Sequence, residues 1–283
     1  MKSVVVTGVS TGIGLGVARV LLAKGYRVFG SVRKAEDATR LLGEFGTRFM
    51  PLVFDVTNTG GVAAGAAVVS STLGTATLAG LVNNAGIAVP GPLLHLPAEE
   101  FRRQLDVNVT GQLVVTQAFA PLLGADAKRQ GPRGRIVMMS SVGGRNAMPF
   151  LGAYNASKFA LEGLAEALRR ELMLLGIDVI IVAPGAIDTP IWDKADAVDA
   201  SPYADTPFYA PLLRMQRAAL ALGRSGLAAE RVGLTVHRAL TARKPHTRYV
   251  VTPDRTENFL VNTLPKRFID RIVARRLGLM PGR

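Results

Sequence analysis

Short, almost wholly apolar segments alternate along this chain with longer segments in which apolar residues recur at helical spacing. The apolar segments predict strands over residues 2–7, 26–31, 48–54, 79–82, 135–140, 178–183 and 248–252. The periodic segments predict helices at about 13–23, 60–73, 98–123, 153–175 and 228–241. Strands that are apolar throughout are covered on both faces, and strands that alternate with helices run parallel. The sequence therefore predicts an α/β fold, a doubly wound parallel sheet.

The alternation stops after Pro184 and resumes only near residue 228. Residues 188–212 contain prolines at 190, 202, 207 and 211, and they carry Trp192, Tyr203, Phe208 and Tyr209. Proline interrupts both helices and strands, so we expect a mobile segment with exposed aromatic side chains here rather than part of the core. We expect residues 190–225 to form a lid over a substrate. Alternatively, the apolar side chains of this segment only pack it onto the body.

The predicted organisation is one Rossmann-like domain over residues 1–253, which includes the lid, followed by a helical extension over 254–283 with a break at Pro265. Of the formal net charge of +13, residues 211–283 carry +11, with 15 basic and 4 acidic residues. In the extension Phe268, Ile269, Ile272 and Val273 alternate with arginines at helical spacing. Such a basic amphipathic helix can lie on an anionic membrane, or it can pack on its own body or on a subunit partner, which we favour. Nucleic-acid binding is not expected, because no recognition motif accompanies the charge.

The composition excludes several classes of site. The chain has no cysteine, so a disulfide framework, a thiol nucleophile and a cysteine zinc site are impossible. Its three histidines, His95, His237 and His246, are too scattered to predict a metal site, and no apolar run is long enough for a membrane-spanning helix. The expected location is cytoplasmic, and contact with a membrane surface is left open.

A glycine-rich turn joins the first predicted strand to the first predicted helix. It reads Thr7, Gly8, Val9, Ser10, Thr11, Gly12, Ile13, Gly14. Such a turn lets backbone N–H groups and the positive end of a helix approach a pyrophosphate without obstruction by side chains. Alone it is also compatible with a tight structural turn, but its place between a strand and a helix favours a dinucleotide site.

The end of the second predicted strand bears on the choice of nucleotide. An NAD site usually carries a carboxylate there, whereas the 2′-phosphate of NADP needs a cation and no carboxylate. The chain reads Ser31, Val32, Arg33, Lys34 at this point. This favours NADP(H) over NAD(H), with Arg33 on the phosphate. The alternative is that Arg33 and Lys34 are only solvated residues at a helix start.

Four polar residues behind this loop form a candidate catalytic set. Tyr154 and Lys158 are spaced i, i+4, so both lie on one helix face, and a neighbouring ammonium lowers the pKa of a phenol toward the range of an acid/base catalyst. Ser141 follows an apolar strand, where its hydroxyl can bond a substrate oxygen, and Asn108 lies in the middle of a predicted helix. A Tyr/Lys pair at helical spacing is commonly only a surface contact, and a buried asparagine commonly only ties structural elements together. Their joint occurrence favours catalysis.

These residues resemble the short-chain dehydrogenase/reductase family in its single-domain branch. The matching motifs span residues 7–189 in the family's order: the Thr7–Gly14 loop, Asp55–Val56, Asn83–Gly86, Asn108, Ser141, Tyr154 with Lys158, and Pro184–Gly185 with Thr189. The resemblance implies that Tyr154 is the acid/base, that Lys158 binds the nicotinamide ribose, that Ser141 polarises the carbonyl and that Asn108 relays protons. The 13-residue spacing to Tyr154 selects Ser141 over Ser140. The implied substrate contacts are Ser141 and Tyr154.

The resemblance also implies a set of cofactor contacts. They are Gly8, Ser10, Thr11, Gly12, Ile13, Gly14, Arg33, Asp55, Val56, Asn83, Ala85, Gly86, Tyr154, Lys158, Pro184, Gly185, Ile187 and Thr189. The segments around Ser141 and Phe159–Gly163 look most like members that act on steroids, retinoids and other lipophilic alcohols or ketones. The implied activity is hydride transfer between NADP(H) and such a substrate, and a homo-oligomer, a dimer or tetramer, is expected. The alternative is a nucleotide-binding regulatory or scaffold protein without turnover.

Overall fold

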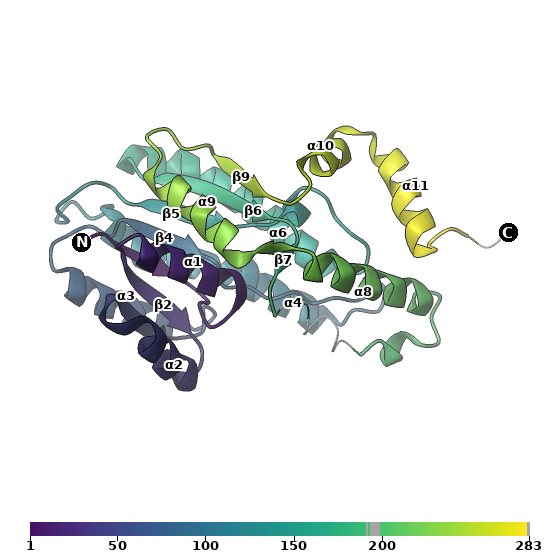
Figure 1. The fold of residues 1–283 in the computed structure, drawn as a ribbon, viewed down its shortest axis with the longest axis horizontal. Helices are drawn as coiled ribbons and strands as arrows, with labels where there is room; N and C mark the ends of the chain where they lie inside the picture. Colours follow the sequence, from purple (N-terminus) through teal and green to yellow (C-terminus); the bar gives the residue numbers. More distant parts are fainter. Residues whose placement is uncertain (191, 193–198, 282–283) are drawn as a thin grey trace.

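The computed structural model describes residues 1–190, 192 and 199–281, and its centre is a seven-stranded parallel sheet (Figure 1). Its strands are β1 (Ser3–Val6), β2 (Arg27–Val32), β3 (Phe49–Val53), β4 (Gly80–Asn83), β5 (Arg135–Met139), β6 (Asp178–Pro184) and β9 (Arg248–Val251). Their order across the sheet is β3-β2-β1-β4-β5-β6-β9. The chain starts in the middle, winds outward through β2 and β3, and returns to wind outward on the other side. The predicted doubly wound fold is therefore confirmed.

Helices cover both faces of this sheet. They are α1 (Gly12–Ala23), α2 (Ala35–Phe45), α3 (Thr59–Leu73), α4 (Ala98–Leu105), α5 (Gly111–Phe119), α6 (Gly152–Glu171) and α9 (Ala229–Thr241). Successive residues of a strand point to opposite faces, so Val4 and Val6 pack with α1 and α9, which lie side by side in Figure 1. Val5 packs with α3, α5 and α6 on the other face. Because both faces are buried, these strands are apolar along their whole length.

The position of the site follows from the strand order. β1 and β4 are neighbours in register, with Val6 opposite Val82, yet the connections that follow them lead to opposite sides of the sheet. A crevice opens at the carboxyl ends of strands where the winding reverses in this way, and ligands bind there in open α/β sheets.

Two helical regions differ from the sequence prediction. The single helix expected over 98–123 is divided into α4, a π-helical turn (Asp106–Thr110), α5 and a 3₁₀ turn (Ala120–Leu123). The sequence analysis did not predict α2, although its apolar residues Ala38, Leu41 and Phe45 recur at helical spacing. Only Ala38 and Leu41 are buried, and four of the eleven residues of this helix are charged.

The lid region is more ordered than predicted. Helix α8 (Tyr209–Arg224) fills its second half, and the short strands β7 (Ile187–Asp188) and β8 (Leu227–Ala228) pair at its base. Ala200 and Leu212 are buried with Phe150 in a small apolar cluster, which we call the lid cluster. Tyr203, Phe208 and Tyr209 pack against it and are half-buried, so the expectation that they are exposed was wrong. The part of the predicted lid at 191 and 193–198 lies outside the described residues.

The C-terminal extension consists of α10 (Arg255–Thr263) and α11 (Lys266–Leu277), and Pro265 separates them as predicted. Figure 1 shows both helices beyond β9, with α11 close to α8. Ile269 and Leu277 of α11 are buried, and Arg214 of α8 donates a hydrogen bond to the Leu277 carbonyl at 3.2 Å. Within the described part of the chain, no helix is both long and apolar enough to cross a bilayer.

Candidate active site

The glycine loop between β1 and α1 forms one wall of the crevice. Gly8 and Gly12 have φ angles of +71° and +60°, which L side chains rarely adopt. A Cβ added to Gly14 would lie 2.1 Å from the Gly8 carbonyl oxygen, so the turn is too tight for any side chain there. The loop therefore leaves backbone and the N-terminus of α1 at the crevice, which is the cradle that a pyrophosphate requires.

Side chains from β1 and from the segment after β4 join the loop to the rest of the crevice. The Thr7 hydroxyl accepts hydrogen bonds from the backbone N–H groups of Asn84 at 2.9 Å and Ala85 at 3.0 Å. The Asn84 amide donates to the carbonyls of Thr7 and Gly8. At the end of β2 the buried Ser31 hydroxyl accepts from Gly8 N–H at 3.0 Å, a contact that sequence reasoning missed. The two motifs thus form one rigid unit.

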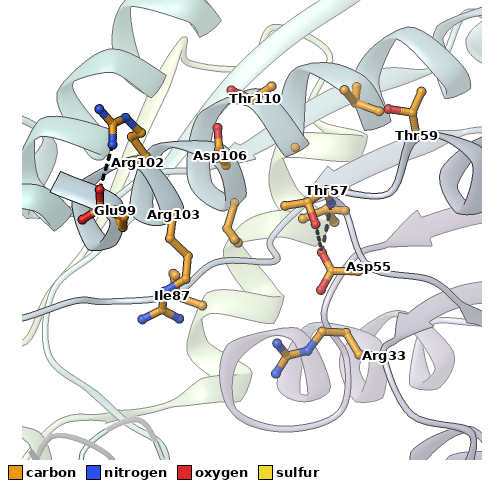
Figure 2. A pocket seen from close by; sticks show the side chains of 14 residues that line it. Arg33, Asp55, Thr57, Thr59, Ile87, Glu99, Arg102, Arg103, Asp106 and Thr110 are labelled. Carbon is orange, nitrogen blue, oxygen red and sulfur yellow. Dashed lines mark hydrogen bonds and ion pairs between the residues drawn. The ribbon is translucent and has the colours of Figure 1, made fainter. Parts of the chain in front are cut away.

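A pocket of about 600 Å³ opens beside this loop (Figure 2). Arg33 and Asp55 line it from the strand side, and Arg102, Arg103 and Asp106 line it from the helix opposite. Val56, Ile87, Val107 and Val114 give it apolar walls. Asp55 accepts hydrogen bonds from the Thr57 backbone N–H and hydroxyl, at 2.9 and 2.7 Å. Apolar walls beside charged side chains of both signs, three arginines and three acids, fit the adenosine half of a dinucleotide.

Two arginines at this end of the crevice differ in their contacts. Arg33 is exposed, and it makes no ion pair or hydrogen bond with the residues that the structure describes. Arg40, in the unpredicted helix α2, donates to the Ser10 carbonyl at 2.8 Å and to Asp37 at 2.9 Å. Arg40 therefore holds the glycine loop, whereas Arg33 retains all its donors for an anion.

Tyr154, Ser141 and Lys158 meet at the carboxyl end of β5. The Tyr154 and Ser141 side chains lie close together, since a Cβ added to Gly143 would be 3.3 Å from the Ser141 Oγ and 3.6 Å from the Tyr154 ring. The Ser141 hydroxyl accepts from the Gly143 N–H at 3.0 Å and donates to the Pro184 carbonyl at 3.4 Å. The Lys158 Nζ donates to the Met139 carbonyl at 2.8 Å and lies 5.7 Å from the centre of the Tyr154 ring. Ser141 and Lys158 are buried, whereas Tyr154 is half-buried. The structure therefore brings these three predicted residues together.

The electrostatics of Tyr154 differ from the sequence prediction. Burial raises the pKa of the Tyr154 phenol, and the hydrogen bond with Ser141 only partly opposes this rise. Burial also lowers the pKa of Lys158 to about 8, although the negative charge of Glu162 counters part of the fall. The Tyr154 pKa is therefore raised on balance and not lowered as predicted, although the Lys158 ammonium lies 5.7 Å from the centre of its ring.

Asn108 lies in the π-helical turn and is fully buried. Its side-chain oxygen accepts from the Ile87 N–H at 2.8 Å, and its amide donates to the Ile87 carbonyl and to the Ser157 hydroxyl, each at 3.0 Å. Ser157 lies between Tyr154 and Lys158 on α6. The Asn108 side chain is thus fully engaged in joining the segment after β4 to the helix that carries the tyrosine.

The remaining predicted cofactor residues fall into two groups. Thr189 lies beside the glycine loop, since a Cβ on Gly12 would be 3.4 Å from the Thr189 Cβ. Gly185 is held by a hydrogen bond to the Val251 carbonyl. In contrast, the Asn83 side chain is fully buried and donates to Thr116, so it supports the sheet behind the crevice. The Ile187 side chain is also in the core, and its carbonyl accepts from the Trp192 ring N–H at 2.7 Å.

The described residues contain no group of three or more histidines and acids that could hold a metal ion.

Known proteins are similar to this chain in sequence and in fold. A model of the family described as short chain dehydrogenase matches residues 2–199. An NADPH-dependent 3-dehydrocapnine reductase from Ornithobacterium rhinotracheale is 40% identical over 273 residues, which are 96% of this chain and 96% of the relative. Retinol dehydrogenase 5 from Homo sapiens is 34% identical over 260 residues, with 87% and 79% covered. A crystal structure of a short-chain dehydrogenase from Streptomyces avermitilis matches with a TM-score of 0.76 and 26% identity, covering 97% of this chain and 94% of that one.

Proposed function

The chain belongs to the short-chain dehydrogenase/reductase family, a family of oxidoreductases, and from this premise we propose that it is an NADP(H)-dependent enzyme. In this proposal it interconverts a lipophilic alcohol and its ketone or aldehyde, with Tyr154 as the acid/base. The observation that carries the proposal is that Tyr154 and Ser141 lie close together with the Lys158 ammonium over the tyrosine ring, at the same edge of the sheet as the glycine loop.

Each residue of this group has a chemical task in the proposed reaction. A nicotinamide cofactor, when bound, supplies or accepts the hydride. The Ser141 hydroxyl holds the substrate oxygen, and the Tyr154 hydroxyl donates a proton to that oxygen in reduction or accepts one from the alcohol in oxidation. The Lys158 ammonium favours the phenolate that remains after proton donation. Asn108 bonds both to Ile87, after β4, and to Ser157 on α6, so it holds α6 at a fixed distance from that segment. Because Tyr154 lies on α6, Asn108 also fixes the position of the tyrosine.

The cofactor preference rests on Arg33 and on a relative. Arg33 offers an unengaged guanidinium at the rim of the pocket, where a 2′-phosphate would lie, and β2 ends without a carboxylate. The relative that is 40% identical is named as NADPH-dependent.

The lipophilic substrate rests on the residues around the lid. A second pocket of about 610 Å³ is lined by apolar residues such as Val89, Leu96 and Tyr203, and also by the charged residues Glu100 and Arg103. The lid cluster with Phe150 lies next to it, and His95 makes ring contacts with both Tyr203 and Phe208. One relative is named a retinol dehydrogenase.

The domain assignment is part of the same proposal. Residues 1–253, with the lid at 190–225, form the catalytic domain, and residues 254–283 form an extension that closes the lid side. A homo-oligomer and a cytoplasmic location remain predictions from the sequence.

The test is turnover by Tyr154→Phe on a panel of steroids, retinoids, long-chain aldehydes and small ketones with NADPH. We expect the wild type to use only bulky apolar members. Tyr154→Phe should lose at least about a hundredfold in kcat, the usual contribution of a general acid, while NADPH binding measured by fluorescence stays nearly unchanged.

Tyr26→Phe makes the same change at a buried tyrosine outside the crevice and serves as the control. Unchanged turnover in Tyr154→Phe would exclude the mechanism, and a preference for small polar ketones would exclude the lipophilic substrate.

A further inference from the structure

An ion pair lies behind the candidate catalytic residues, away from the crevice. Arg248, on the edge strand β9, donates from Nε to both carboxylate oxygens of Glu162 on α6, at 3.1 and 3.0 Å. Each side chain is only 12% exposed. Other ion pairs of the described chain are much more exposed: Glu166 and Arg170, on the same helix, are 49% and 66% exposed.

The pair contacts the catalytic group at several points. The Ser140 hydroxyl donates to Glu162 Oε1 at 2.7 Å, and Arg248 Nη2 donates to the Ser141 carbonyl at 3.2 Å. Tyr154, Lys158 and Glu162 follow one another at i+4 intervals, so they form one row along α6. The neighbouring loop comes close because Gly144 has no side chain: a Cβ there would lie 2.6 Å from the Ser140 Oγ.

Stability alone gives a weak reason for such a pair. Taking two charges out of water costs free energy, and a well-packed apolar pair of the same volume is often as stable or more stable. The contacts made by this pair point to the reaction instead. Glu162 bonds to Ser140 and Arg248 bonds to Ser141, the two residues that directly follow β5. Glu162 is also the next residue after Lys158 in the row along α6.

We propose that Glu162 and Arg248 are positioning residues, which set the charge of Lys158 and hold the backbone of Ser141 from the edge of the sheet. The inference rests on the proposed function, since it assigns the pair a role in that same site. Glu162 keeps Lys158 protonated, and Arg248 limits how much of the Glu162 charge Lys158 senses.

The expected signs follow from the groups that face Lys158. These are Tyr154 and Glu162 on α6, Arg248 on β9 behind Glu162, and Arg145 at the rim, whose Nε lies 3.6 Å from Glu162 Oε2. In Glu162→Gln the negative charge is gone while both guanidinium groups remain, so the Lys158 pKa should fall from about 8. In Arg248→Gln the carboxylate keeps only the more exposed Arg145 as a cationic partner, so the Lys158 pKa should rise.

The experiment is an NMR titration of full-length protein labelled with ¹³C at lysine Cε, without cofactor or substrate. The Lys158 signal is identified by its loss in Lys158→Met. We expect its midpoint to move down by roughly one pH unit in Glu162→Gln and up by a similar amount in Arg248→Gln, the scale of shift that a neighbouring charge produces. Glu166→Gln, one turn further along α6, should leave the midpoint unchanged.

Opposite shifts of the Lys158 midpoint distinguish this role from a purely structural one. A purely structural role would lower the unfolding temperature of both variants without moving the Lys158 midpoint in opposite directions.

Activity provides a second readout. The pH at which kcat falls on the alkaline side should be lower in Glu162→Gln than in the wild type. It should be shifted in Arg248→Gln but should stay at the wild-type value in Arg248→Lys, which keeps the positive charge. An unmoved Lys158 midpoint in both variants would overturn the inference, even if turnover depends on Tyr154. A shifted midpoint in a protein whose turnover does not depend on Tyr154 would support the charge coupling and refute the proposed function instead.

Discussion

The carboxyl end of β5 with α6 and the lid with the C-terminal extension are two neighbouring regions that are built in opposite ways. Around β5 and α6 polar side chains are buried and each reaches a partner far away in sequence, as Lys158 does with Met139 and Asn108 with Ser157. The lid cluster consists of three buried side chains under a rim of half-buried ones. It is joined to the sheet region through the two-residue strands β7 and β8.

This difference indicates a division of labour. Proton transfer requires groups held within a fraction of an ångström, which buried side chains with defined hydrogen bonds provide. Substrate choice needs only a shaped apolar surface, and a thinly buried region opens locally at a lower free-energy cost than the core. We therefore expect equivalent substitutions to have larger effects on the α6 side than on the lid side.

The largest expected difference is between two leucines. Leu161 of α6 is fully buried in the core between the sheet and the helices, whereas Leu212 is buried in the small lid cluster. Leu161→Ala should lower the free energy of unfolding by about 4 kcal/mol, and Leu212→Ala by about 2 kcal/mol, because the half-buried rim of the lid can close around the missing volume. Urea unfolding of both variants measures the two losses. Equal losses would show that the lid is as firmly packed as the core.

A glycine substitution tests how rigid the crevice is. In Gly14→Ala the new methyl group would lie 2.1 Å from the Gly8 carbonyl oxygen, so backbone must move, at a cost of about 3 kcal/mol. NADPH binding should be lost with it, because the loop is the proposed phosphate cradle. Gly43→Ala in α2, where a Cβ meets nothing within 4 Å, is the control and should be neutral or slightly stabilising. The two variants are compared by thermal unfolding and by fluorescence titration with NADPH.

The sheet and the catalytic group were predictable from sequence for the same physical reason. Residues such as Val4, Val5 and Val6 are fully buried on both faces of a parallel sheet, so their strand leaves a continuous apolar run. Tyr154 and Lys158 have a spacing that any α-helix converts into proximity. Their chemistry and their geometry are thus both encoded over a few adjacent residues.

The contacts that sequence could not reveal are those between distant segments or those on weakly patterned elements. Arg40 reaches Ser10 only because α2 forms, and the two residues are 30 positions apart in the sequence. Arg248 meets Glu162 across 86 positions, which no local pattern records. The raised pKa of Tyr154 could not be foreseen either, since it depends on how deeply the fold buries the phenol.

Arg33 offers a test of the exposed rim of the crevice. Arg33→Ala should weaken NADPH binding by about 2 kcal/mol, the scale of a charged hydrogen bond, and should weaken NADH binding far less. Lys34→Ala, at the next residue, separates a specific phosphate contact from general positive charge and should change both affinities little. Fluorescence titration with the two cofactors gives the four values, and equal losses of NADPH and NADH affinity in Arg33→Ala would refute the assignment to the 2′-phosphate.

The smallest expected effect concerns the attachment of the extension to the lid. Arg214→Ala removes the hydrogen bond to the Leu277 carbonyl at the end of α11, which should cost about 1 kcal/mol and lower the unfolding temperature by about 2 °C. Arg217→Ala, at an exposed position on the same helix α8, is the control. Differential scanning calorimetry resolves a change of this size.

The same attachment decides between the two interpretations of the basic extension. Ile269 and Leu277 are buried beside α8, whereas Phe268 is 51% exposed among arginines, so α11 uses its apolar residues for packing and leaves a mainly basic surface outside. Deleting residues 266–283 should therefore lower the unfolding temperature further than Arg214→Ala and raise KM for a bulky substrate, because the lid loses its neighbour. Vesicles with anionic lipids should bind neither the intact nor the truncated protein at 0.15 M salt, where exposed charges are screened beyond about 8 Å. Salt-sensitive vesicle binding by the intact protein, with no loss of stability on truncation, would show that α11 serves a membrane surface and that the lid is held by its own cluster alone.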